Sequence, residues 1–370
     1  MLGNEEAGAK SLGVYMATIC LCAVFALGIS WVYTSTQGIR FLESGYPVWS
    51  AKRTMLGACD LGEVAVFGDS RADSAVIPSR LSKQASNLGF AGGTPIEIYF
   101  FARSLQSCSK KPKTVLLSFN PGAFEVIQPW LWDNAARYGA LGWSEISIIR
   151  QEAERLNDRS YFTTKPQIGL DGLMRDVTYS TRFPAIYFNS LIESKVLLRA
   201  DANRQKFNEV MLSRGYPTYK AGAHVDEGPA KGGDKPFTPL PLQESFFEKT
   251  VAMLDRAGID TFFMITPFNQ ANPRALNPGY QEAYLALIRR LGSQYPHFHL
   301  LQQQAPVWPN IYFADGVHLN EEGADTFSRQ LDHCLQELGT PGDPDDRCKF
   351  DSIKHALKTA NTTVREKPAL

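Results

Sequence analysis

Short apolar runs that alternate with helical segments predict an α/β domain built on a doubly wound parallel sheet with strand order 2-1-3-4-5. The runs at 64–67 and 114–119 are almost wholly apolar, which is typical of strands buried on both faces of a sheet. The alternation stops near Pro121 and returns near Gln243, so the sequence predicts a long insertion at about 121–243. The expected strands are 64–67, 86–89, 114–119, 259–266 and 297–301, and the expected helices are 78–83, 95–107, 146–156, 192–199, 243–257, 280–291 and 320–338.

The N-terminal region differs from the rest of the chain. Residues 11–33 contain no Asp, Glu, Lys or Arg, and Trp31 near the end of this stretch suits a membrane interface. As a helix, the stretch is long enough to cross a hydrocarbon core of about 30 Å, and it is longer than the apolar part of a cleaved signal peptide. We therefore expect an arm at 1–10 and an uncleaved transmembrane anchor at 11–33, with a signal peptide as the alternative. More basic residues follow the span than precede it, so flanking charge does not argue for an extracytoplasmic domain.

The overall composition is that of an ordinary globular protein. Of the 370 residues, 44% are hydrophobic and 21% are charged, and 38 Lys and Arg residues balance 38 Asp and Glu residues. Because no basic stripe stands out, nucleic acid is not an expected partner. We expect a short stalk at 34–58, because Gly45 and Pro47 interrupt this segment as they do in loops. We also expect one folded domain at 59–338 that includes the insertion, and a polar tail at 339–370.

The cysteines bear on the compartment. Two of the six lie in the apolar span, and the other four show no metal-ligand spacing. Cys59 and Cys108 each precede a strand, and in the expected sheet these two strands are neighbours, so both cysteines lie at its amino edge. Cys334 in the last helix can reach Cys348 in the tail. We predict Cys59–Cys108 and Cys334–Cys348 disulfides and hence an oxidising, extracytoplasmic compartment. Four unpaired cysteines are the alternative.

A serine and a distant histidine are the candidate catalytic residues. Ser70 follows the strand at 64–67 and a tight turn, which places its side chain at the carboxyl edge of the sheet, where ligands bind. Serine needs a base to act as a nucleophile. Asp315 precedes His318 by three residues, a spacing that lets the carboxylate orient the imidazole while the far ring nitrogen faces the serine. The sequence therefore predicts a Ser70–His318–Asp315 triad.

Four short blocks, in this order, resemble the SGNH (GDSL-like) hydrolase superfamily, and the resemblance covers about 60–125 and 255–338. The blocks are Gly68-Asp69-Ser70, the segment 87–94 with Gly92, the segment 117–120 with Asn120, and Asp315-x-x-His318. The resemblance implies a flavodoxin-like three-layer α/β/α sandwich, with 59–338 as its catalytic domain. It also implies an oxyanion hole formed by the Ser70 and Gly92 amides and the Asn120 side chain. No metal or organic cofactor is signalled.

Two positions depart from the family pattern. Arg71 follows the serine where an apolar residue is usual, and Asn120 precedes a proline instead of an aspartate. Each block also has a purely structural interpretation. The Gly-Asp-Ser segment is a common turn, Asp-x-x-His is a common helix start, Asn-Pro is a common turn, and Gly92 with its neighbour can form a simple loop.

The resemblance, together with the anchor, implies a function in the cell envelope. Membrane-anchored relatives with long insertions act in O-acylation or deacylation of exported polysaccharides, often beside a multi-span membrane acyltransferase. We therefore expect a single-pass inner-membrane protein with an extracytoplasmic serine esterase or O-acetyltransferase domain. Its expected substrate is an exopolysaccharide, with cellulose as one candidate, and an export complex is a further expected partner. A lipid esterase or thioesterase and an inactive scaffold of an export complex are the alternatives.

Two further features of the insertion concern the substrate. Trp130 and Trp132 can stack on sugar rings beside the serine or form the core of the insertion. The segment 224–241 is rich in glycine and proline and is expected to be an exposed loop, in which His224 is solvated and not catalytic.

Overall fold

A computed structural model describes residues 2–195, 198–220, 236–270, 277–338 and 348. Its centre is a five-stranded sheet in the order β2-β1-β3-β4-β6, and every neighbouring pair is parallel. The strands are β1 (Val64–Gly68), β2 (Ala85–Gly89), β3 (Thr114–Ser118), β4 (Asp260–Phe263) and β6 (Phe298–Leu300). A small second sheet pairs β5 (Phe268–Asn269) with β7 (Val307–Trp308). The predicted parallel α/β sheet and its strand order are confirmed.

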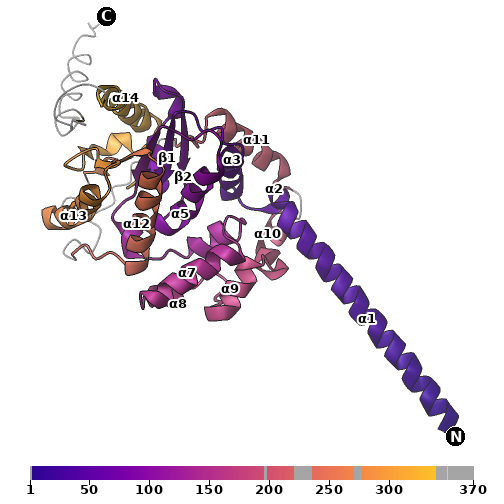
Figure 1. Ribbon diagram of the computed structural model, residues 1–370. Helices are drawn as coiled ribbons and strands as arrows, with labels where there is room; N and C mark the ends of the chain where they lie inside the picture. The colour runs from indigo at the N-terminus through magenta and orange to yellow at the C-terminus, as the bar shows by residue number, and fades with distance from the viewer. Residues whose placement is uncertain (1, 196–197, 221–235, 271–276, 339–347, 349–370) are drawn as a thin grey trace, which may run out of the picture.

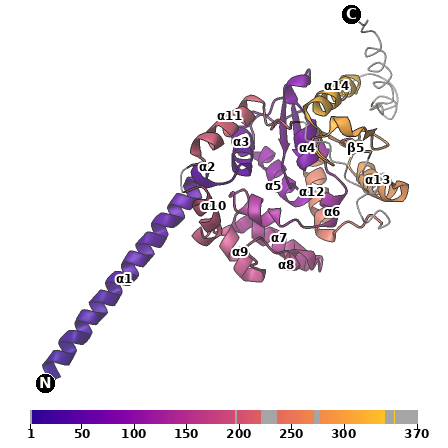
Figure 2. The same ribbon diagram turned by 180° about the vertical axis from the view of Figure 1, so that it is seen from behind.

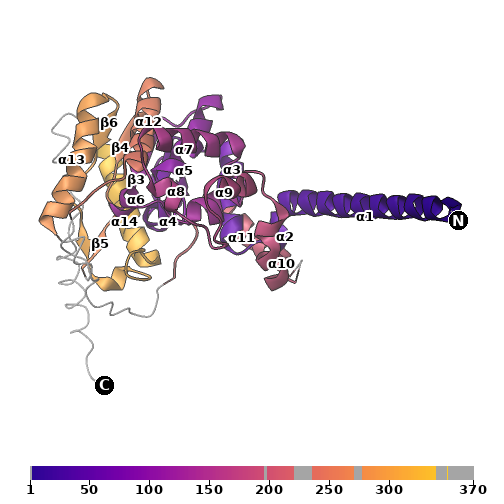
Figure 3. The same cartoon turned by 90° about the horizontal axis from the view of Figure 1, so that it is seen from below.

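Helices cover both faces of the sheet. Successive side chains of the buried strands point to opposite faces, and they pack into two separate hydrophobic cores. One face packs against α5 (Pro95–Arg103), α12 (Pro241–Arg256) and α13 (Pro278–Gln294), and Phe247 of α12 contacts Phe263 of β4. The other face packs against the short α4 (Ser70–Ala75) and α14 (Glu321–Glu337). Figure 3 shows the sheet between these groups of helices.

The first helix after β1 begins earlier than predicted. The expected helix at 78–83 is a short 3-10 turn at Pro78–Arg80, whereas α4 starts at Ser70 itself. The reason is local, because the Asp69 carboxylate accepts a hydrogen bond from the Arg71 amide at 2.9 Å and caps the helix directly after the strand. A second 3-10 turn, Ser104–Ser107, completes the predicted helix at 95–107.

The helix α1 (Leu2–Thr36) extends away from the domain (Figures 1 and 2). Its segment Gly13–Thr36 is long and apolar enough to cross a membrane, and the side chains of its most apolar stretch are not buried by the rest of the protein. This matches the apolar span predicted at 11–33. A helix of this kind near an N-terminus also fits a signal sequence by length and composition.

The stalk expected at 34–58 is instead part of the folded domain. The chain forms α2 (Gly38–Phe41) and α3 (Gly45–Gly57), and Trp49 of α3 is buried against Phe90 with ring centroids 4.5 Å apart. Pro47 suggested a break, but it lies in the first turn of α3, where its missing N–H has no helical partner. The domain therefore begins at the end of α1.

The insertion is helical. Its helix predicted at 146–156 is confirmed as α7. The helix predicted at 192–199 is wrong for most of its length, because α10 ends at Glu193, residues 194–195 and 198–199 form turns, and α11 begins only at Ala200; residues 196–197 lie outside the described residues. Its core places Trp132 against Tyr161 and Tyr179. The elements are α6 (Gly122–Glu125), a π-helix (Leu131–Ala136), α7 (Trp143–Arg155), α8 (Ser160–Thr163), α9 (Gly172–Ser180), a 3-10 turn (Pro184–Tyr187), α10 (Phe188–Glu193) and α11 (Ala200–Leu212).

Both predicted disulfide pairs are present. Cys59 and Cys108 are bonded with their Cα atoms 5.5 Å apart, and Cys334 and Cys348 with theirs 4.9 Å apart. Such bonds are typical of oxidising compartments. Apart from Cys348, the predicted tail at 339–370 lies outside the described residues, as does most of the loop predicted at 224–241, including His224.

Candidate active site

Ser70 lies at the carboxyl edge of the sheet, between β1 and α4. Gly68, the last residue of β1, must approach β3 closely, because a Cβ atom at this position would lie 1.9 Å from the Ser118 carbonyl oxygen. The Asp69 side chain then turns back to cap α4. The glycine and the aspartate before Ser70 therefore shape the turn that presents the serine hydroxyl.

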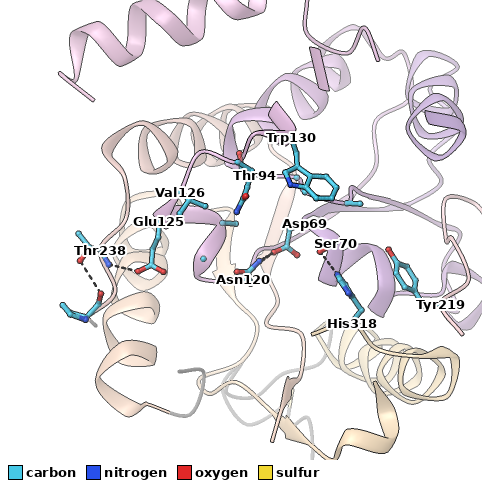
Figure 4. Close-up of a pocket in the computed structure, with 17 residues that line it drawn as sticks. Asp69, Ser70, Thr94, Asn120, Glu125, Val126, Trp130, Tyr219, Thr238 and His318 are labelled. Carbon is cyan, nitrogen blue, oxygen red and sulfur yellow. Dashed lines mark hydrogen bonds between the residues drawn. The ribbon is translucent and has the colours of Figure 1, made fainter. Parts of the chain in front are cut away.

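Ser70, His318 and Asp315 form a continuous hydrogen-bonded chain. His318 Nε2 lies 2.8 Å from Ser70 Oγ, a contact drawn in Figure 4. His318 Nδ1 lies 2.7 Å from Asp315 Oδ2. The other oxygen of Asp315 accepts hydrogen bonds from the amides of Val317 and His318, both at 2.8 Å. These contacts hold the carboxylate and the imidazole in one turn. The structure thus brings together the three side chains predicted as a triad.

The hydrogen bonds also decide the charge of Asp315. Partial burial acts to raise the pKa of its carboxyl group, but the hydrogen bonds from the His318 side chain and from the two amides lower it. The net effect is a pKa below the ordinary value. Asp315 is therefore ionised near neutral pH and can stabilise a protonated His318.

Asn120 is held beside the serine by Asp69. Its backbone amide donates to Asp69 Oδ2 at 2.7 Å, and its side-chain amide donates to the same oxygen. Asp69 thereby joins the start of α4 to the end of β3. One hydrogen bond to Asp69 uses one of the two protons that the Asn120 side-chain amide can donate.

Gly92 lines the same cleft as Ser70, Asn120 and His318. Its φ of +73° is in the left-handed region that favours glycine, and a Cβ atom there would lie 3.1 Å from atoms of the Trp130 side chain. The backbone conformation therefore favours glycine at this position, and any larger residue would also need the indole to shift by a few tenths of an ångström. All five residues predicted for the site are near one cleft: Ser70, Gly92, Asn120 and His318 line it, and Asp315 lies behind His318.

The cleft has a volume of about 850 Å³ and extends well beyond the serine. From Ser70 and His318 it passes Trp130 and reaches Glu125 and Thr238 (Figure 4). Its size is in the range of ligand-binding clefts. It can hold a group considerably larger than an acetyl ester.

The two tryptophans considered for sugar contact have different environments. Trp130 lines the cleft and is 49% exposed. Trp132 is fully buried, and the Arg175 guanidinium lies 4.0 Å from the centre of its ring. The stacking hypothesis is therefore wrong for Trp132, which belongs to the core of the insertion, and stays a prediction for Trp130.

A buried ion pair between Lys52 and Asp73 lies behind His318, and the sequence did not predict it. Lys52 of α3 donates to the Asp73 carboxylate and to the Gly89 carbonyl, and both charged side chains are almost completely buried. Asp73 also accepts a hydrogen bond from the Tyr219 hydroxyl at 3.2 Å, and the Tyr219 ring stacks on His318 with centroids 5.6 Å apart. No local sequence signal connects these positions, because their contact depends on the packing of three separate segments.

Burial decides the pKa values of this ion pair. Desolvation raises the pKa of Asp73, and the nearby charge of Lys52 opposes that rise without cancelling it. Desolvation also lowers the pKa of Lys52. Removing both charges from water costs free energy, and the close contact between Lys52 and Asp73 offsets part of that cost.

Arg71, which departs from the family pattern, does not line the cleft. Its side chain is buried, and its guanidinium lies 4.4 Å from the centre of the Phe268 ring. Burial lowers the pKa of the guanidinium. The cation–π contact accounts for a charged residue next to the serine without giving it a place in the cleft.

Comparison with known proteins adds no assignment, since neither a family model nor a curated protein matches this chain. Within the described ranges, no group of three or more His, Cys, Asp or Glu side chains is placed to hold a metal ion. The geometry of the cleft is therefore the basis on which a function can be assigned.

Proposed function

We propose that this protein is a membrane-anchored serine esterase or O-acyltransferase of the SGNH type that acts on an exported polysaccharide. The observation that carries the proposal is the hydrogen-bonded chain from Ser70 through His318 to Asp315, which ends at the wall of a large cleft. A serine hydroxyl that donates to an oriented imidazole is the arrangement used for acyl transfer.

The proposed reaction passes through a covalent acyl-enzyme. Ser70 Oγ forms a bond to the ester carbonyl carbon while its proton moves to His318 Nε2, and Asp315 stabilises the resulting imidazolium. The alcohol then leaves with that proton. In the second half, a water molecule or a sugar hydroxyl gives a proton to His318 and attacks the acyl carbon. The bond to Ser70 Oγ then breaks, and His318 returns the proton to Ser70 Oγ. The same intermediate therefore serves both hydrolysis and transfer.

The negative charge that develops on the carbonyl oxygen needs hydrogen-bond donors. We assign this role to the amides of Ser70 and Gly92 and to the side-chain amide of Asn120. The support is positional, since all three residues line the cleft and Asp69 holds the Asn120 side chain beside the serine. Removal of one such donor is expected to lower turnover on the order of a hundredfold.

Trp130 supports a carbohydrate as the substrate, because an exposed indole on a cleft wall offers an apolar face for a sugar ring. The apolar helix α1 and the two disulfides are compatible with an inner-membrane anchor and an extracytoplasmic catalytic domain. A substrate on an exported polymer, with cellulose as one candidate, fits this location. The proposed partner is a multi-span membrane acyltransferase or an export complex that supplies acyl groups.

The test uses the full chain in detergent with p-nitrophenyl acetate. Wild type is expected to give a burst of p-nitrophenol and an acetyl adduct in the intact mass. Ser70→Ala is expected to lose both, whereas Ser107→Ala, which changes an exposed serine outside the cleft, keeps both. Oligosaccharide acceptors then separate transfer from hydrolysis by the fate of the acetyl group.

Two outcomes would contradict the proposal. An adduct and burst that persist in Ser70→Ala would exclude Ser70 as the nucleophile. Folded wild-type protein that gives neither signal, with activated thioesters also tried, would indicate a non-catalytic scaffold.

A further inference from the structure

Helix α9 has the reverse of the usual pattern of burial. Its two charged residues, Arg175 and Asp176, point into the insertion and are 0% and 2% exposed. They are ion-paired to each other, and Asp176 also binds Arg150 at 2.7 Å. Leu173 and Met174 point outward and are 61% and 67% exposed. A surface helix of a soluble domain has the opposite arrangement, so this face is not built for contact with water.

The next helix of the insertion continues the apolar surface. Phe188 and Ile192, one turn apart on α10, are both largely exposed, as is Leu198 after it. We call the exposed apolar side chains of this region the collar. The collar consists of Leu173, Met174, Val177, Phe188, Ile192 and Leu198.

The collar is attached to the end of the membrane helix. Trp31 of α1 donates from its indole nitrogen to the Thr181 carbonyl at 2.9 Å, and its ring contacts Phe183 edge to face with centroids 5.4 Å apart. Arg182 donates to the Ser35 carbonyl at 3.1 Å. Residues 181–183 connect α9 to the turn before α10, so both helices lie beside the end of α1 (Figures 1 and 3).

We propose that the collar is a membrane-binding surface that lies in the interface of the same lipid bilayer that α1 crosses. Trp31 belongs to the apolar span, and the segment that it contacts leads directly into both collar helices. Exposed apolar side chains at that level are stabilised by burial at the boundary between headgroups and acyl chains. The collar thereby sets the tilt of the domain, and with it the position of the cleft relative to the membrane.

This inference rests on the anchor in the proposed function and is independent of the chemistry at Ser70. The test places an environment-sensitive NBD fluorophore at single cysteines in the full chain. The background is Cys20→Ser with Cys22→Ser, since these are the free cysteines in the part of the chain that the structure describes. The labelled variants are Met174→Cys and Phe188→Cys.

The matched control is Leu212→Cys, an apolar and even more exposed position at the end of α11. That end is next to Arg214, whose carbonyl accepts from the Asn87 amide of β2, so it lies against the sheet and away from α1. A label on native Cys22, in a Cys20→Ser background, reports insertion of α1.

The proteins are reconstituted in nanodiscs of phosphatidylethanolamine and phosphatidylglycerol, with and without spin-labelled lipid. We expect blue-shifted emission and severalfold stronger lipid quenching at positions 174, 188 and 22 than at 212. Iodide in the aqueous phase serves as the opposite quencher. If lipid quenches position 22 while iodide quenches positions 174 and 188 as strongly as position 212, the collar is overturned and the anchor stays intact. That result would instead indicate a protein partner on this face. No quenching at position 22 would overturn both the anchor and the collar.

Discussion

The buried Lys52–Asp73 pair permits a quantitative test of how the site is supported. Lys52→Met keeps a side chain of similar length and removes the charge. The Asp73 carboxylate then keeps only the Tyr219 hydroxyl as a side-chain partner in the described structure and stays buried. Removal of one member of a buried ion pair typically costs about 3–5 kcal/mol, because the remaining charge is uncompensated. We expect a loss of stability in this range at pH 7.

The double variant Lys52→Met with Asp73→Asn identifies the cause. Asparagine has nearly the same shape as aspartate and can still accept the Tyr219 hydrogen bond, but it carries no charge. If the loss comes from the unpaired carboxylate, the double variant recovers most of it. If it comes from lost packing around Lys52, the double variant is no more stable than Lys52→Met.

The raised pKa of Asp73 also predicts how the stability of the protein changes with pH. Burial raises the folded-state pKa of Asp73 above its unfolded value, so the folded protein holds the proton more tightly. Stability therefore falls as the pH rises from the unfolded pKa through the folded one. Loss of Lys52 removes the charge that opposes this rise. The deficit of Lys52→Met is thus expected to be small in acid and to widen towards neutral pH, whereas the double variant lacks this dependence.

Denaturant unfolding of the full chain in detergent, followed by circular dichroism from pH 4 to 8, measures these differences. The control is Lys113→Met, which removes a largely exposed lysine paired with Glu63 and is expected to change stability little. A Lys52→Met variant as stable as wild type at pH 7 would refute the reasoning.

Three further predictions concern residues in or next to the cleft. Burial raises the pKa of Glu97, which accepts a hydrogen bond from the Thr94 amide, to about 7. Stability should therefore fall by up to about 3 kcal/mol as the pH rises from 4.5 to 7. Glu97→Gln should flatten that curve in the same unfolding assay, and an unchanged slope would contradict the assignment. Tyr219→Phe keeps the ring on His318 and should retain most of kcat, whereas Tyr219→Ala should lower kcat and shift its pH profile; equal losses in both would exclude a positioning role for the ring. Trp130→Ala should raise KM for an oligosaccharide ester with little effect on p-nitrophenyl acetate, and Trp130→Phe should restore part of the affinity; an unaltered KM would reject the stacking role.

Much of the fold could be predicted because its signals are local. Strands β1 and β3 are nearly continuous apolar runs, and their parallel pairing follows from the helical segments that alternate with the strands. The disulfide between Cys59 and Cys108 then follows from the strand order, since both residues precede neighbouring strands. The stalk prediction was wrong for a related reason. Glycine and proline near Pro47 were interpreted as loop signals, whereas the burial of Trp49 depends on Phe90, far away in the sequence.

The sequence by itself determined the parallel sheet, the turn that presents Ser70 and the pairing of Asp315 with His318. These features depend on periodicity and on hydrogen bonds between residues a few positions apart. Only the tertiary structure decided that Trp130 faces the cleft while Trp132 is buried, that Lys52 and Asp73 meet behind His318, and that α9 turns its charges inward. The physical reason is that burial is a property of the packed chain. Whether a side chain meets water, a partner charge or a neighbouring ring depends on segments that its own sequence neighbourhood does not contain.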